Sequence, residues 1–103
     1  MQDEEINYFA AKLPSPRPTF PMDMSDDEKQ IMGEHTAFWQ TLLQSGQGII
    51  VGPVLDPKGA YGFGVVIADS LEDACSLLEK DSAQKISKYE IYPMRALVPA
   101  KKK

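Results

Sequence analysis

The stretch from Ser25 to Gly46 predicts a long amphipathic helix, and such a helix needs an apolar surface to pack against. Ser25 and Glu28 have the spacing of a capping box at its start, and Gly46 suits a left-handed cap at its end. His35, the only histidine of the chain, lies on the apolar face. The residues of this face recur at helical spacing, and they are Ile31, Met32, His35, Phe38, Trp39, Leu42 and Leu43.

The remaining segments predict four strands and a second helix. Residues 6–13, 48–56, 61–68 and 88–98 have the composition of strands. Ser70 and Asp73 cap a second amphipathic helix that begins near residue 71. The order is therefore strand, helix, strand, strand, helix, strand. Two helices can cover one face of a four-stranded antiparallel sheet, so the sequence predicts an α+β fold, the ferredoxin-like plait.

Glycines and prolines add detail to the predicted strands. Gly62 and Gly64 leave one face of the third strand nearly bare, which predicts the close approach of a helix, a ring or a ligand. Pro93 cannot donate to a strand ladder, so the last strand is expected at a sheet edge or with a bulge. Residues 56–59, DPKG, suit a type I turn between the second and third strands.

The first strand offers apolar side chains to both faces of the sheet, although the helices can cover only one. An exposed apolar sheet face predicts association with another sheet. A symmetric homodimer, or a higher homo-oligomer, is the economical arrangement. Residues 1–103 are expected to form a single domain with flexible tails at 1–5 and 99–103.

Composition limits the functional classes. With 15 acidic and 11 basic side chains the net charge is −4, which argues against a nucleic-acid-binding domain with a basic patch. No apolar run approaches the roughly 20 residues that span a bilayer, and the acidic start MQDEEINYF is unlike a secretory signal. A cytoplasmic protein without membrane contact is therefore predicted. One histidine, one cysteine and scattered carboxylates give no metal-ligand spacing, so no metal site is predicted.

Three stretches resemble the YciI-like (YCII-related) family of small dimeric α/β-barrel domains. They are residues 8–46, residues 52–65 (GPVLDPKGAYGFGV) and residues 89–98 (YEIYPMRALV). The resemblance implies the plait, the dimer, and a cleft in which a histidine and an aspartate form the catalytic centre. These two family residues correspond to His35, in the motif EH before an aromatic pair, and to Asp81. The family aspartate usually precedes proline, whereas Ser82 follows Asp81 here.

Each assignment has a structural alternative. His35 could be a hydrogen-bonded core residue, and Asp81 could be a solvated turn residue. Arg17, in the proline-rich loop of residues 14–24, could bind an anionic group of the substrate or pair with the acidic helix start at Asp26 and Asp27. The other predicted substrate-binding residues are Phe20, Trp39, Tyr61 and Ser82, and the spacing of the three aromatic residues equally suits core packing.

The resulting hypothesis is a cofactor-independent enzyme in which His35 and Asp81 transfer protons on a small cyclic or aromatic metabolite. The reaction would be an isomerisation or an elimination, by analogy with muconolactone-isomerase-like and dehydrochlorinase-like enzymes of the wider superfamily. The alternative is a non-catalytic dimeric module that binds a small ligand or has a regulatory role. It is favoured by the serine that follows Asp81 in place of the family's proline. A scaffold whose sheet recruits another protein is a third alternative.

Overall fold

The computed structural model describes residues 7–99. The predicted tails, 1–5 and 99–103, lie outside the described residues except for Pro99. The elements in chain order are β1 (Tyr8–Leu13), α1 (Asp26–Ser45), β2 (Gly48–Val54), β3 (Tyr61–Ile67), α2 (Leu71–Leu78), the short 3-10 helix η1 (Ser82–Lys85) and β4 (Glu90–Met94).

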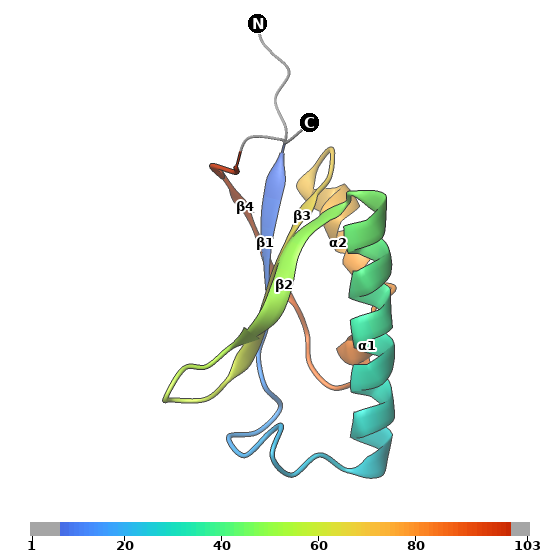
Figure 1. The fold of residues 1–103 in the computed structure, drawn as a ribbon, viewed down its shortest axis with the longest axis vertical. Helices are drawn as coiled ribbons and strands as arrows, with labels where there is room; N and C mark the ends of the chain where they lie inside the picture. Colours follow the sequence, from blue (N-terminus) through green and yellow to red (C-terminus); the bar gives the residue numbers. More distant parts are fainter. Residues whose placement is uncertain (1–6, 100–103) are drawn as a thin grey trace, which may run out of the picture.

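The four strands form one antiparallel sheet in the order β2-β3-β1-β4. Figure 1 shows α1 and α2 on the same side of this sheet, with α1 running along its length. The predicted α+β arrangement, a ferredoxin-like plait, is thus confirmed. Of the elements, only η1 has no counterpart in the sequence prediction.

The ends of α1 follow the predicted capping signals. The Ser25 side chain accepts a hydrogen bond from the backbone N–H of Glu28, whose carboxylate accepts one from the Ser25 N–H. Gly46 closes the helix with a φ of 86°, in the left-handed region where glycine is favoured. At α2 the Ser70 side chain accepts a hydrogen bond from the backbone N–H of Asp73. Local sequence therefore determines where both helices begin.

The strand register separates the two faces of the sheet. One row across the strands contains Val51, Gly64, Ala11 and Ile91, and this row faces the helices. The core on this side consists of Phe9, Ala11, Trp39, Leu42, Val66, Ala74 and Leu78. The adjacent row contains Ile50, Val65, Ala10 and Tyr92, so these side chains lie on the face that neither helix covers.

Gly64 of β3 allows α1 to approach the sheet. A Cβ atom on Gly64 would lie 2.6 Å from the Trp39 ring, much closer than van der Waals contact allows. The predicted close approach at this bare face is confirmed, and the ring of Trp39 makes it.

β4 is shorter than the predicted strand of residues 88–98. Its ladder ends where Met94 pairs with Tyr8, because β1 offers no further partner. β4 lies at the edge of the sheet, so Pro93 sits at an edge position, as predicted. Within residues 7–99, no helix has the length and apolar character needed to cross a membrane.

Candidate functional site

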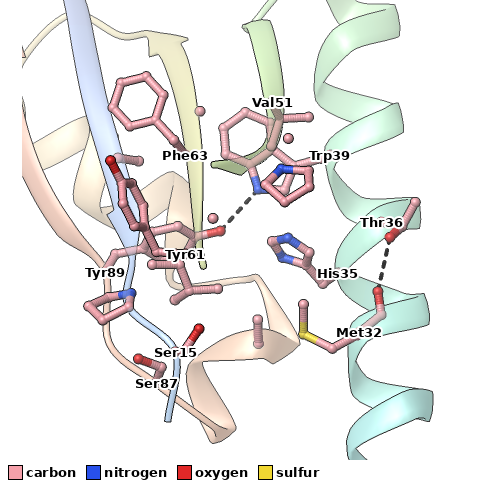
Figure 2. A pocket seen from close by; sticks show the side chains of 18 of the residues that line it. Ser15, Met32, His35, Thr36, Trp39, Val51, Tyr61, Phe63, Ser87 and Tyr89 are labelled. Atoms are coloured by element: carbon pink, nitrogen blue, oxygen red, sulfur yellow. Dashed lines mark hydrogen bonds between the residues drawn. The ribbon is translucent and has the colours of Figure 1, made fainter. Parts of the chain in front are cut away.

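A cavity of about 460 Å³ lies between α1 and the side of the sheet that the helices cover. Its walls come from α1, from β1, β2 and β3, from the proline-rich loop of residues 14–21, and from the segment of residues 83–89. The lining is predominantly apolar. Figure 2 shows the His35 ring projecting from α1 into this space, with Trp39 beyond it and Met32 below.

His35 and Asp81 are in contact although 46 positions separate them in the sequence. The Nδ1 atom of His35 lies 2.7 Å from Oδ2 of Asp81. An ionised carboxylate can only accept hydrogen bonds, so Nδ1 carries a proton and donates it. Asp81 does not border the cavity, whereas the His35 side chain does and remains 14% exposed. Because Nδ1 is engaged with Asp81, Nε2 is the ring nitrogen that remains to meet a ligand in the cavity.

Asp81 is held in place by its position before η1. It is the N-cap of this 3-10 helix, and its Oδ1 accepts a 2.9 Å hydrogen bond from the backbone N–H of Ala83. Its side chain is fully buried. Burial raises the pKa of Asp81, but the hydrogen bonds from His35, Tyr89 and Ala83 outweigh burial and lower the pKa below its ordinary value. Asp81 is therefore an ionised, buried residue rather than a solvated turn residue.

Tyr89 belongs to the same network, and the sequence did not single it out. Its hydroxyl donates to Oδ2 of Asp81, the oxygen that also accepts from His35. The same hydroxyl accepts a 3.0 Å hydrogen bond from Nε1 of Trp39, drawn as a dashed line in Figure 2. Tyr89 lies just before β4 and borders the cavity. The only sequence signal was an aromatic residue at the start of a predicted strand, which does not distinguish a site residue from a core residue.

The three predicted aromatic residues all border the cavity, and they come from different elements. Phe20 lies in the proline-rich loop, Trp39 on α1 and Tyr61 at the start of β3. Phe20 and Trp39 are buried, and Trp39 also belongs to the hydrophobic core. Both interpretations of these residues, packing and cavity wall, are thus compatible with their positions.

Arg17 and Ser82 do not border the cavity. Arg17 forms a bidentate ion pair with Glu28, with distances of 2.8 and 2.7 Å, and its Nε donates to Asp23 at 3.0 Å. Its guanidinium thus binds carboxylates, as predicted. These carboxylates belong to Asp23 and Glu28 of the protein itself, and not to Asp26 or Asp27. The hydroxyl of Ser82 donates to the carbonyl oxygen of Ile31, which ties η1 to α1. Substrate binding by these two residues has no support from their positions.

The site has few groups that could hold a cofactor. In the part of the chain that the structure describes, no three His, Cys, Asp or Glu side chains gather to form a metal site. Polar lining groups include Ser15 and Thr36, whose hydroxyls donate to the carbonyl oxygens of Ala60 and Met32. The site therefore offers one imidazole, which a buried carboxylate orients and which borders an apolar cavity.

Fold and site together define a two-layer α+β domain that carries a histidine–carboxylate pair beside an apolar cavity. The family follows from comparison with known proteins. The model of the YCII-related domain matches residues 7–97, so the chain belongs to that family, as the sequence resemblance predicted. A search among curated proteins finds no significant match.

Proposed function

We propose that this protein is a cofactor-independent enzyme that transfers a proton within a small cyclic substrate. The observation that supports this proposal is the contact between the His35 ring, which borders the cavity, and the buried carboxylate of Asp81. A base that is oriented in this way and open to a ligand-sized space can act as a general acid–base catalyst, which typically accelerates reactions by about 10²–10⁴-fold.

In the proposed mechanism, Nε2 of His35 takes a proton from an acidic C–H bond of the substrate. The electron pair of that bond moves into the substrate, and the imidazolium is stabilised by the carboxylate of Asp81. In an isomerisation, Nε2 then returns the proton to a different carbon. In an elimination, the electron pair forms the double bond as a leaving group departs. Asp81 stays ionised throughout and holds the ring in the tautomer whose Nε2 can accept.

The lining of the cavity favours an uncharged substrate. Among the described residues that border it there is no lysine, arginine, aspartate or glutamate. A charged group would lose its hydration there without gaining a fixed partner other than His35. Aromatic walls from Phe20, Trp39 and Tyr61 suit a flat or cyclic compound. We therefore propose a neutral cyclic carbon acid, such as a cyclic ketone or an unsaturated lactone.

Proton exchange in D₂O tests this proposal without knowledge of the natural substrate. A panel of cyclic ketones and unsaturated lactones is incubated with the protein, and loss of the acidic C–H signal is followed by ¹H NMR. We expect at least one compound to exchange faster than in buffer. His35→Gln should abolish the acceleration. The matched control Glu34→Gln, at the exposed neighbouring position, should retain it.

A second candidate, a non-catalytic module that binds a small ligand, is favoured by one observation. The protons of the Ser15 and Thr36 hydroxyls are donated to backbone carbonyls, so these groups are not free to stabilise a developing oxyanion. Quenching of the fluorescence of Trp39, the only tryptophan, reports binding. Compounds that bind without exchanging faster than in buffer, for wild type and His35→Gln alike, would favour this module and contradict the enzyme.

We also propose that the chain forms a symmetric homodimer through the uncovered face of its sheet. Ile50 and Tyr92 lie in one row on that face and are 61% and 58% exposed. Exposed apolar side chains in one row favour burial against a second copy. Light scattering during gel filtration should give twice the mass of the chain, and Ile50→Asp should give a folded monomer. A monomeric wild type would contradict the dimer.

A further inference from the structure

We propose that Tyr89 is a positioning residue of this site, which fixes Asp81 and thereby controls the proton affinity of His35. The inference rests on the proposed function for its catalytic meaning, but its hydrogen-bond chain can be tested without turnover. Four side chains form this chain in the order Trp39, Tyr89, Asp81 and His35.

The direction of each hydrogen bond in this chain is fixed by the chemistry of its ends. The indole Nε1 of Trp39 can only donate, so the Tyr89 oxygen must accept from it. The one hydroxyl proton of Tyr89 is then free to be donated to Asp81. Because an ionised carboxylate cannot donate, the proton between Asp81 and His35 belongs to Nδ1. Trp39 at one end thus helps to select the histidine tautomer at the other.

Burial keeps Tyr89 in the donor role. Desolvation and the neighbouring Asp81 carboxylate raise the pKa of Tyr89 far above its ordinary value, so the hydroxyl is protonated at neutral pH. Oδ1 of Asp81 already accepts from the backbone N–H of Ala83. Both carboxylate oxygens are therefore occupied, and the carboxylate cannot rotate without losing a hydrogen bond.

Two donors compete for one oxygen of Asp81. Tyr89 and His35 both donate to Oδ2, so part of the negative charge that could stabilise an imidazolium is neutralised by the phenol. Without the Tyr89 hydroxyl, Asp81 would interact more strongly with protonated His35. In that variant a larger share of His35 would carry a proton on both ring nitrogens and could not accept another from the substrate. The Tyr89 hydroxyl thereby limits the attraction between Asp81 and a protonated His35.

Tyr89→Phe tests the inference by NMR, because the chain contains one histidine and one tryptophan. The imidazole ¹⁵N signals then report only His35, and the indole N–H signal reports only Trp39. We expect Tyr89→Phe to move the indole N–H signal away from its hydrogen-bonded position and to move the midpoint of the His35 titration to higher pH. Tyr92→Phe, which keeps the ring and removes a hydroxyl on the face of the sheet opposite the helices, is the matched control and should change neither.

A second measurement covers the case in which Tyr89→Phe does not fold. Replacing all tyrosines by 3-fluorotyrosine makes the phenol a stronger donor while keeping the rings, and the His35 midpoint should then move to lower pH. Unchanged indole and imidazole signals in folded Tyr89→Phe, or no shift in the fluorinated chain, would overturn the inference. These results do not depend on substrate, whereas failure of the D₂O exchange would overturn only the proposed enzyme.

Discussion

Gly64→Ala places one methyl group against the most buried ring of the protein. The added Cβ would lie 2.6 and 2.9 Å from two carbons of the Trp39 ring, which is 1% exposed. The ring cannot retreat easily, because its Nε1 is hydrogen-bonded to Tyr89. Such overpacking typically costs about 1–3 kcal/mol, whereas replacing a strand glycine by alanine gains about 0.5–1 kcal/mol. We therefore expect a net destabilisation of about 0.5–2 kcal/mol.

The neighbouring glycine provides a matched control on the same strand and the same face. A Cβ on Gly62 would lie 3.6 Å from Cβ of Leu13, which is ordinary van der Waals contact. Gly62→Ala should therefore leave the free energy of unfolding unchanged or raise it by up to about 1 kcal/mol. Urea unfolding followed by Trp39 fluorescence and by circular dichroism measures both variants.

The thermal melt gives a second measure of the same difference. For a domain of this size, about 1 kcal/mol corresponds to roughly 4–8 °C, so Gly64→Ala should lower Tm by roughly 2–16 °C. The indole N–H signal of Trp39 should also move in Gly64→Ala and stay in place in Gly62→Ala. Equal stability of the two variants would refute the argument, because it would mean that the Trp39 ring does not press on β3.

Two further predictions concern charged residues. Because the native pKa of Asp81 lies below its ordinary value of 3.8, its ionised form stabilises the fold above that pH, and the stabilisation is lost as pH falls through the native pKa. Asp81→Asn should therefore be less stable than wild type at neutral pH, and the stabilities of the two proteins should converge as pH falls from 3.8 through the native pKa. Arg17 is paired with Glu28 outside the cavity, so Arg17→Gln should leave binding of the cyclic panel unchanged, as measured by Trp39 fluorescence. If Arg17→Gln weakened the binding of every compound, this prediction would be contradicted, and Arg17 would be a substrate-binding residue.

Helical spacing was sufficient to place His35 and Trp39 on the inner face of α1. An α-helix has a fixed period, so a stripe of apolar residues determines which side chains turn toward the sheet. The bare face of β3 likewise predicted a close approach, because a strand alternates its side chains with a period of two. Only the identity of the ring that fills the space, Trp39, required coordinates.

The pairing of His35 with Asp81 could not be derived from periodicity. Asp81 lies between α2 and η1, and its distance from α1 depends on how this irregular segment packs. Family resemblance supplied the pair instead. Tyr89 was missed for the same reason, since it precedes β4 and its direction depends on the path of residues 86–88. Arg17 shows the reverse case, in which the chemistry was predictable but the nearest carboxylate came from the capping box, at Glu28.

Trp39 links the stability of the fold to the geometry of the site. The six-membered part of its ring lies against Gly64 in the core, and its Nε1 begins the hydrogen-bond chain that ends at His35. A variant that displaces the ring without unfolding the protein should therefore disturb the His35 titration as well as the melt. Gly64→Ala is such a variant, whereas Val65→Ala, which removes buried methyl groups on the face of the sheet that neither helix covers, should lower stability and leave the His35 titration unchanged. If both variants moved the titration equally, the His35 signal would report general loosening of the fold rather than the chain from Trp39.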